Sequence, residues 1–503
     1  MFRASLSLTL VLALTGLARG QESLDQIDQA KAESSTAKTS VAEVNGYLDN
    51  RLQGSWINPN TSPVSTRDQP ALQDILEANV QLKVHLGSSA FVYADLSLFF
   101  QYGTLYYQSD GMGGRQGVAD HWVAGLQPFF SPNELYISYA PRPWLHFLAG
   151  RKRVVWGSGF AFNPTDLINP PKDPTDPNLQ RAGAWQARIE LPFERFTFSL
   201  LAAPSVLYSS YGLPSAMLAY PSAANLPPPA SGQAMSYRDD QFHYLLAARL
   251  YALIWDSDIN LMAFFSNQYN DGFANKLRLG ASFSRYFFTD YELHAEALFQ
   301  QGSARPFVNH WCVADGAGFG SPGCPDPAAA IGPSKLADSA ITARVLVGGR
   351  TMFKDESTLS IEYYYQGDGD SDLEFEDTLR ALVRAQQSHV ALPFGPAAVQ
   401  DPAVKFAFDP LRRHYLIASY MKPKIHDDWT LGATLIAGLR DLSGMFAPMV
   451  SWDAREWLTL TLNGFIPIRG IPVGQVSVNG NSYSEYSMLP FDWRVLFEAR
   501  AFY

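Results

Sequence analysis

The stretch Asp492–Tyr503, DWRVLFEARAFY, decides how the rest of the chain is interpreted. Counted in twos, one face carries Trp493, Val495, Phe497, Ala499, Ala501 and Tyr503, and the other carries Arg494, Leu496, Glu498, Arg500 and Phe502. Successive side chains of a β-strand point to opposite sides of the sheet, so this pattern predicts a strand with one apolar and one largely charged face. A half-buried edge strand of a soluble sheet would show the same pattern, so the remaining chain must decide between the two.

The composition favours strands over membrane-spanning helices. Aromatic residues make up 13% of the chain, and charged residues only 17%. Beyond the N-terminus, no apolar run approaches the roughly eighteen residues that a spanning helix needs. The net charge of −10 argues against nucleic acid as a partner.

Residues 1–20 have the parts of a secretory signal peptide. Arg3 supplies the positive start, Leu6–Leu17 the apolar core, and Ala18-Arg19-Gly20 a small-x-small cleavage site. Residues 21–43 are polar and do not alternate, so we expect a periplasmic N-terminal segment. Residues 44–503 are expected to form one β-domain.

Two cysteines lie in one Gly- and Pro-rich stretch. Cys312 and Cys324 are 12 positions apart, and in an oxidising compartment they are predicted to pair as a disulfide. A zinc site is the alternative, but it needs more ligands than His310 alone.

Alternating segments recur along the chain, about eighteen in all, and their connections alternate between long and short. The segments are 44–56, 75–86, 89–101, 133–140, 143–153, 182–191, 195–203, 241–252, 258–266, 274–286, 290–302, 339–353, 357–366, 412–422, 428–438, 444–452, 456–466 and 490–503. One link, near 441–443, is short where a long one is expected. Alternation of this kind is typical of a transmembrane antiparallel up-and-down β-barrel with both termini inside, whereas soluble sandwiches and propellers have no reason to segregate their long loops.

The barrel hypothesis assigns each face of a strand. A charge that faces lipid at mid-bilayer costs roughly 2–4 kcal/mol, so the apolar faces must point outwards and the charged faces into the lumen. The predicted pore-lining residues are Arg188, Glu190, Arg249, Glu292, His294, Glu296, Arg344, Glu362, Arg494, Glu498 and Arg500. A lumen of this width and charge is expected to hold water. An acid–base cluster around His294 is the enzymatic alternative to a hydrated row of ion pairs.

The stretch 150–174, GRKRVVWGSGFAFNPTDLINPPKDP, is the most distinctive internal segment. Its prolines stiffen the backbone, and Asn163 and Asp166 can bond their own turns, so we expect a stiff loop that narrows the mouth. The candidate constriction residues are Arg151, Lys152, Arg153, Trp156, Asn163, Asp166, Lys172 and Asp173. Strict alternation puts Arg151 and Arg153 on the lipid side. Either they lie near headgroups, or a bulge turns them inwards.

This stretch resembles the Trp-Gly…Asn-Pro-x-Asp segment of porin-like bacterial outer-membrane barrels, including barrels of exopolysaccharide export systems. The terminal Phe502 and Tyr503 resemble the closing strand that the barrel-assembly machinery reads. The resemblance implies a translocation pore in the bacterial outer membrane, surrounded by lipid and lipopolysaccharide, with a periplasmic polysaccharide-export protein as a candidate partner. It transfers no ligand residues and favours no oligomeric state.

The acidic run Gly367–Asp377 is the one stretch that suggests a metal. Asp368, Asp370 and Asp372 have the ligand spacing of a calcium loop, but Leu373 and Leu379 stand where glycine and glutamate are needed. We therefore expect a solvated outer loop, with no metal and no cofactor. No catalytic motif appears either, so the chain is not expected to be an enzyme.

The sequence thus favours a channel for hydrophilic cargo, with carbohydrate passing through the pore of a polysaccharide export system. A general or sugar-uptake diffusion porin is the alternative within the same class. A barrel plugged by its own loops, acting as an adhesin, receptor or scaffold, is the alternative of another class.

Overall fold

The computed structural model describes residues 42–57, 69–107, 117–122, 129–169, 183–204, 244–266, 276–288, 290–302, 307–308, 331–332, 341–388, 411–472, 477–478, 481–489 and 491–503. The predicted signal peptide, most of the segment 21–43, Lys172, Asp173, Cys312 and Cys324 lie outside these residues.

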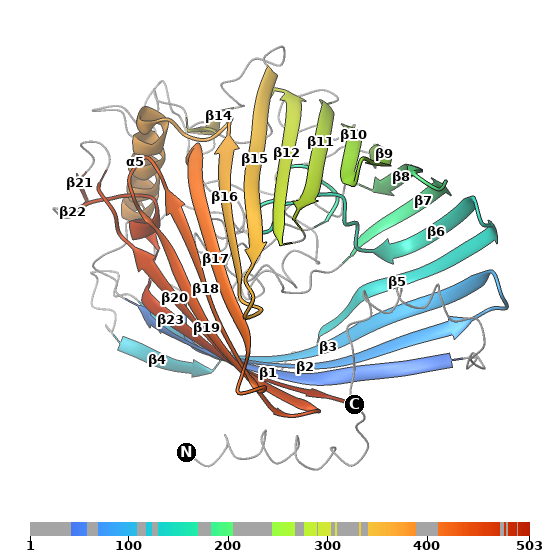
Figure 1. Cartoon of the computed structure of the whole chain (residues 1–503). Coiled ribbons are helices and arrows are strands. Elements are labelled where there is room, and N and C mark those ends of the chain that lie inside the picture. Colours follow the sequence, from blue (N-terminus) through green and yellow to red (C-terminus); the bar gives the residue numbers. More distant parts are fainter. Residues whose placement is uncertain are drawn as a thin grey trace, which may run out of the picture.

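Eighteen antiparallel strands form a closed barrel, which confirms the predicted fold class (Figure 1). Each strand pairs with its neighbours in chain order, and the first pairs with the last, which closes the ring. The strands are β1 (Ala42–Ile57), β2 (Gln69–His85), β3 (Ala90–Tyr107), β5 (Phe129–Arg142), β6 (Leu145–Lys152), β7 (Ala184–Pro192), β8 (Phe196–Pro204), β9 (Tyr244–Ile254), β10 (Ser257–Ser266), β11 (Lys276–Phe287), β12 (Tyr291–Gln301), β15 (Ile341–Met352), β16 (Thr358–Gln366), β17 (His414–Ile425), β18 (Trp429–Gly438), β19 (Gly444–Arg455), β20 (Leu458–Ile468) and β23 (Phe491–Phe502).

The short connections lie at the end of the barrel where β1 begins and β23 ends. One of the two-residue links joins β9 to β10 through Trp255 and Asp256, whose φ angles are 51° and 56°. Two consecutive residues with positive φ match the right-handed twist of the flanking strands, as in type I′ hairpins. The short link 439–443 lies at the opposite end, as the sequence predicted.

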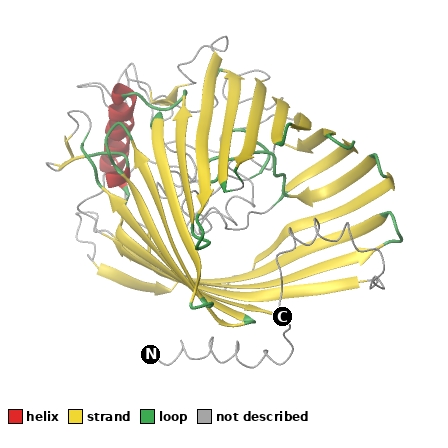
Figure 2. Ribbon diagram, in the orientation of Figure 1, coloured by secondary structure: helices red, strands yellow, loops and turns green. Residues whose placement is uncertain are grey.

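Smaller elements extend or cap the barrel. Strand β4 (Gly117–Trp122) pairs with the end of β3, and two-stranded pieces are formed by β13 (Phe307–Val308) with β14 (Ile331–Gly332) and by β21 (Ser477–Val478) with β22 (Asn481–Ser482). Among the described residues, the helical elements are α5 (Asp372–Ser388), red in Figure 2, and the 3₁₀ turn η6 (Tyr486–Met488). Within the described residues, no helix is long and apolar enough to cross a membrane.

Helix α5 corrects the expectation of a solvated acidic loop. Asp368 and Asp370 are buried, and the helix begins at Asp372. Ser371 and Glu374 bond reciprocally: the Ser371 N–H donates to Glu374 at 2.8 Å, and the Glu374 N–H to Ser371 Oγ at 3.4 Å. This capping box satisfies two backbone donors that would otherwise lack partners.

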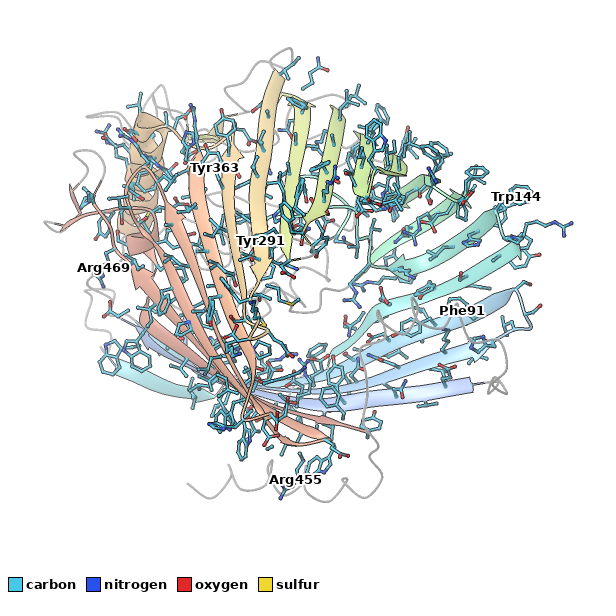
Figure 3. The ribbon with its side chains drawn as sticks, in the orientation of Figure 1. Phe91, Trp144, Tyr291, Tyr363, Arg455 and Arg469 are labelled. Atoms are coloured by element: carbon cyan, nitrogen blue, oxygen red, sulfur yellow. The ribbon has the colours of Figure 1, made fainter. Side chains whose placement is uncertain are left out.

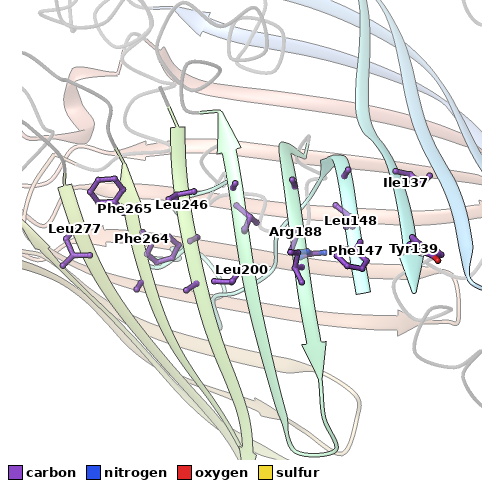
Figure 4. Close-up of a pocket in the computed structure, with 18 residues that line it drawn as sticks. Ile137, Tyr139, Phe147, Leu148, Arg188, Leu200, Leu246, Phe264, Phe265 and Leu277 are labelled. Atoms are coloured by element: carbon purple, nitrogen blue, oxygen red, sulfur yellow. The ribbon is translucent and has the colours of Figure 1, made fainter. Parts of the chain in front are cut away.

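The outer face of the wall is apolar. On β12 and β16, Phe299 is 49% exposed, Tyr291 57% and Tyr363 37%, whereas Glu296 and Glu362 on the same strands are 1% exposed. Figure 3 labels Tyr291 and Tyr363 among the side chains of the wall. Between β5 and β11 the outer face is hollowed by a groove of about 740 Å³, in which Ala187, Ala202 and Ala248 lie among larger apolar side chains (Figure 4). Such a surface is suited to lipid and not to water.

The inner face is not polar throughout, although the sequence led us to expect a polar lumen of mixed charge. Two apolar clusters pack there. The first joins inward residues of β15–β19, such as Leu346, Tyr415 and Ile436, to α5 and residues 483–489. The second joins inward residues of β7–β12 to residues 154–168. Segments between strands therefore fold into the barrel and share a core with its wall.

Candidate functional site

Residues 153–169, which we call the constriction segment, follow β6 and fold back inside the barrel. The chain passes into it through Gly150, which has a φ of +128°. A Cβ at this position would lie 2.2 Å from the Leu135 carbonyl oxygen. Only glycine tolerates this backbone angle together with so close an approach.

Glu296 on β12 bonds the constriction segment from one side. Its carboxylate accepts hydrogen bonds from the backbone N–H groups of Ser158 and Gly159, the latter at 2.5 Å. It also accepts from the Thr165 hydroxyl at 2.8 Å and the Thr165 N–H at 3.3 Å. A buried carboxylate with this many donors is held firmly, because charge-assisted hydrogen bonds are stronger than neutral ones.

Glu362 on β16 bonds the next two residues of the segment. Its two oxygens accept the N–H groups of Phe160 at 2.5 Å and Ala161 at 2.9 Å. His294 Nε2 lies 2.9 Å from the same carboxylate, and His294 Nδ1 lies 3.5 Å from Glu292. Four consecutive backbone donors are thus shared between carboxylates on two strands, which fixes the path of the segment across the interior.

Aromatic contacts hold the constriction segment against the barrel wall on either side of residues 158–161. Trp156 packs against Phe264 of β10, with ring centroids 6.0 Å apart. Phe162 stacks on Tyr364 of β16 at 4.8 Å, with the ring planes 20° apart. The segment therefore contacts the walls that carry both inner apolar clusters.

Internal hydrogen bonds give the segment its own shape. The Asn169 side chain accepts the Val154 N–H at 2.9 Å and donates to Asp166 at 2.7 Å. With its amide nitrogen turned towards them, Asn163 donates to the carbonyls of Gly159 and Phe162. Asn163 and Asp166 thus hold turns of the segment by bonds of the kind that the sequence suggested.

Three of the predicted pore-lining residues do not face an open bore. Glu296, Glu362 and His294 are each 1% exposed: the constriction segment bonds the two glutamates, and His294 lies between Glu362 and Glu292. The alternation of the strands places them on the inner face, but it does not predict that a loop lies on top of them. Glu296 and Glu362 anchor that loop, and His294 supports Glu362.

The other predicted pore-lining residues each have partners among the described residues. Arg188 lies 3.5 Å from Glu190, and Arg249 donates to Asn260 at 2.7 Å. Arg344 forms a bidentate ion pair with Asp368: its Nε donates to Oδ1 at 3.2 Å and its Nη2 to Oδ2 at 3.0 Å.

At the seam between the first and last strands, Arg500 bridges Asp49 at 3.1 Å and Glu498 at 2.8 Å. Arg494 is buried there and donates to Ser55 at 3.1 Å. The Phe502 ring contacts Tyr47 edge-on, with centroids 6.4 Å apart, and the Tyr503 backbone bonds Gly46.

The basic cluster at the end of β6 fits the two alternatives only in part. Arg153 turns inwards, where its side chain lies 3.5 Å from Glu134 and its N–H donates to the same carboxylate at 2.7 Å. Arg151 is buried and donates to the Gly183 carbonyl at 2.8 Å, so it lies neither at the headgroups nor at an open pore. Lys152 donates to the Tyr136 hydroxyl at 3.1 Å.

Two groups escaped the sequence reasoning. Thr165 bonds the constriction segment to Glu296, Glu134 of β5 accepts the Arg153 N–H of the segment, and nothing in their local sequence marks either residue for that role. Asp441 and Glu485 form a second buried acidic pair, on connections between strands. Within the described ranges, no three His, Cys, Asp or Glu side chains are placed to hold a metal ion.

No family model matches the chain, and no curated protein matches it. Solved structures resemble it in fold. OccAB1 of Acinetobacter baumannii is 10% identical, with 93% of this chain and 99% of that one covered and a TM-score of 0.47. OprB of Pseudomonas putida is 11% identical, with coverage of 92% and 94% and a TM-score of 0.38. DcaP, an outer membrane channel of Acinetobacter baumannii, is 9% identical, with coverage of 92% and 97% and a TM-score of 0.33. The fold of this chain is defined by its own strand pairings.

Proposed function

We propose that the chain is a channel of the bacterial outer membrane that passes hydrophilic solutes, with residues 153–169 as its constriction. The observation that carries this proposal is the double anchor of Glu296 and Glu362. Two buried carboxylates on the inner wall bond four consecutive N–H groups of one loop. Burying a carboxylate is unfavourable unless hydrogen bonds offset the loss of hydration. Here the bonds that offset it also fix the loop inside the barrel.

The location follows from the wall. A closed barrel leaves no strand edge unpaired, and its apolar exterior is suited to the hydrocarbon layer of a bilayer. Residues 1–20 supply an export signal, and the strand that ends in Phe502 and Tyr503 supplies a signal for the barrel-assembly machinery. Lipid and lipopolysaccharide then surround the barrel.

The inner wall on β1–β3 is polar, and its charges are compensated. It carries Gln53, Gln73, Asn79 and Ser97, and its carboxylates are bonded to arginines or amides, as in the pair of Arg51 and Glu77 at 2.5 Å. These side chains are buried, and Asn79, Ser97 and Glu77 bond one another, so the wall is polar with compensated charge and does not select for one sign of ion. Together with the Trp156-Gly157…Asn163-Pro164 resemblance, this supports carbohydrate passage and a polysaccharide export system with a periplasmic partner.

Planar-bilayer recording of the purified protein tests the channel, and swelling of liposomes with sugars of increasing size tests the cargo. We expect steady single-channel currents, and a larger current when Glu296 and Glu362 are both replaced by alanine, because the segment then loses its anchors. Glu190→Ala is the matched control, since Glu190 lies on the inner wall but bonds no residue of the segment. Sugars that enter only the double variant would identify the segment as the size limit.

The plugged barrel remains the competing function because one specific observation favours it. The cluster of α5, residues 483–489 and strands β15–β19 fills part of the interior with apolar side chains. Bilayers that stay silent with correctly folded protein would overturn the channel and support a receptor or scaffold.

A further inference from the structure

Asp441 and Glu485 form a pair of buried carboxylates apart from the constriction segment. Asp441 lies in the link 439–443 between β18 and β19, and Glu485 lies just before η6. They are 1% and 0% exposed. The Glu485 N–H donates to Asp441 at 2.8 Å, so the two acidic residues belong to one hydrogen-bonded unit.

The Glu485 carboxylate accepts bonds from two further elements. The Tyr415 hydroxyl of β17 donates to it, with oxygen distances of 2.8 and 2.7 Å, and the Leu411 N–H donates at 2.7 Å. Asp441 is held by the N–H of Ser443 at 3.0 Å and by its hydroxyl at 2.8 Å. Residues 483–489 are thus fixed to the barrel end through a carboxyl group.

The charged groups around Glu485 do not neutralise it. Asp441 faces it from the link 439–443, and Arg412 faces it from the segment before β17. The Arg412 guanidinium bonds Asp372 and the Ser371 carbonyl and lies 4.8 Å from the Phe375 ring, so its charge is directed towards α5. Tyr415 and Tyr486 are the remaining titratable neighbours.

The same unit contacts the constriction segment. The Tyr415 ring lies 6.4 Å from the Phe162 ring, while its hydroxyl bonds Glu485. Tyr486 and Met488 belong to the apolar cluster that contains Ala161 and Phe162. A change in the charge of Glu485 can therefore affect the packing of Phe162 in two ways, through Tyr415 and through the apolar cluster that Tyr486 and Met488 share with Phe162.

Burial, and then the charge of Asp441, raise the pKa of the Glu485 carboxyl to about 7. A carboxyl whose pKa is raised in the folded state stabilises that state while it is protonated. The stabilisation is complete below its ordinary pKa of about 4.5, declines as the pH rises, and is lost above about 7.

We propose that Glu485 is a positioning residue that makes the bore respond to pH: in its protonated form it seats residues 483–489 and the Phe162 end of the constriction segment, and its ionisation loosens both. The inference rests on the proposed channel function. Acid narrows the passage and neutral pH widens it. Asp441 sets the pH of the change because its charge opposes the ionisation of Glu485.

The test is single-channel recording of the full-length protein at steps from pH 5 to pH 9. We expect the wild-type probability of the wider state to rise up to about tenfold per pH unit towards pH 7 and to level off above it. Glu485→Gln should stay at the low-pH level throughout. Asp441→Asn should shift the response to lower pH. Glu456→Gln, an exposed change in the β19–β20 turn, should follow the wild type.

A second measurement does not require conduction. Limited proteolysis within 483–489, normalised to cleavage in the turn 426–428, should speed up from pH 5 to pH 7 in the wild type and not in Glu485→Gln. Equal pH responses in wild type and Glu485→Gln, or none in either, would overturn the inference. Silent bilayers combined with a pH-dependent cleavage that Glu485→Gln abolishes would overturn the channel and leave Glu485 as the pH-sensitive anchor.

Discussion

The hydroxyl of Tyr503 donates to the backbone carbonyl of Asn79 at 2.7 Å, across the strand that separates them. The Tyr503 side chain lies over Gly46 of β1 and reaches β2. Gly46 leaves room for it: a Cβ at this position would lie 2.4 Å from both the tyrosine ring and the Asn79 carbonyl oxygen. The last residue of the chain therefore joins three strands at the place where the barrel closes.

This contact predicts the effects of two substitutions on closure. Tyr503→Phe should cost about 1 kcal/mol, the value of one hydrogen bond, and leave assembly intact. Gly46→Val should impair assembly strongly, because its side chain occupies the space of the tyrosine ring. Heat-modifiable migration on gels and urea unfolding in vesicles measure both. Gly54→Ala is the control, since no atom lies within 4 Å of its added Cβ. Full assembly of Gly46→Val would contradict this account of the seam.

The two faces of β7 predict opposite tolerance to charge. Ala187 lies on the exposed outer face at mid-strand, and Glu190 on the inner face beside Arg188. Ala187→Arg should reduce membrane assembly, because an arginine that faces lipid at mid-bilayer costs roughly 2–4 kcal/mol. Glu190→Arg should assemble normally. The yield of folded protein in outer-membrane fractions decides between them, and equal yields would reject the assignment of faces.

A substitution at Gly159 tests how tightly the constriction segment is packed. A Cβ there would lie 2.1 Å from the Phe162 carbonyl oxygen, so Gly159→Ala must displace the turn that Glu296 and Glu362 hold. We expect a changed single-channel conductance with an unchanged urea midpoint for the barrel. Gly54→Ala on β1 again provides the control. A conductance identical to wild type would mean that the segment does not limit the passage.

Asp372 predicts a loss of order in α5 at acid pH. A hydrogen bond from Arg440, and a second from Arg412, lower the pKa of the Asp372 carboxyl to about 2. A lowered pKa stabilises the folded state above the ordinary value, so the contribution is lost as the pH falls from about 4 to about 2. Hydrogen exchange of residues 372–380 should quicken over that range in the wild type.

The Asp372→Asn variant should show the faster exchange already at pH 5 and little further change below it. Asp256→Asn, in the turn between β9 and β10, serves as the matched carboxylate change far from the helix. If exchange in the Asp372→Asn variant at pH 5 equals that of the wild type, the ion pairs with Arg412 and Arg440 do not hold the helix.

The barrel could be predicted because alternation acts locally. Each strand must present an apolar face to lipid, so apolar residues such as Leu293, Ala295 and Phe299 recur at alternate positions, and this pattern is visible in the sequence of one strand alone. The terminal strand shows the same agreement, and it pairs with β1 from Tyr47 opposite Phe502 to Arg51 opposite Glu498.

The candidate site could be predicted only in part. The stiffness of residues 153–169 follows from their sequence, but their partners Glu296 and Glu362 lie more than 130 positions away, and the donors are backbone N–H groups that every residue has. The alternation of the strand predicts that Glu296 lies on the inner face, but it does not predict that the constriction segment covers it. Helix α5 did carry a local signal, the Ser371-x-x-Glu374 capping box, which the acidic calcium-like spacing obscured.

A cylinder one strand thick bends easily, and lateral pressure in a membrane tends to flatten it into an oval. The constriction segment is bonded to β12 and β16 and packed against β10, so flattening the ring would have to break buried charge-assisted hydrogen bonds. The loop that narrows the passage is thus also an internal brace, and a channel that lost it would change its cross-section whenever the surrounding lipid changed.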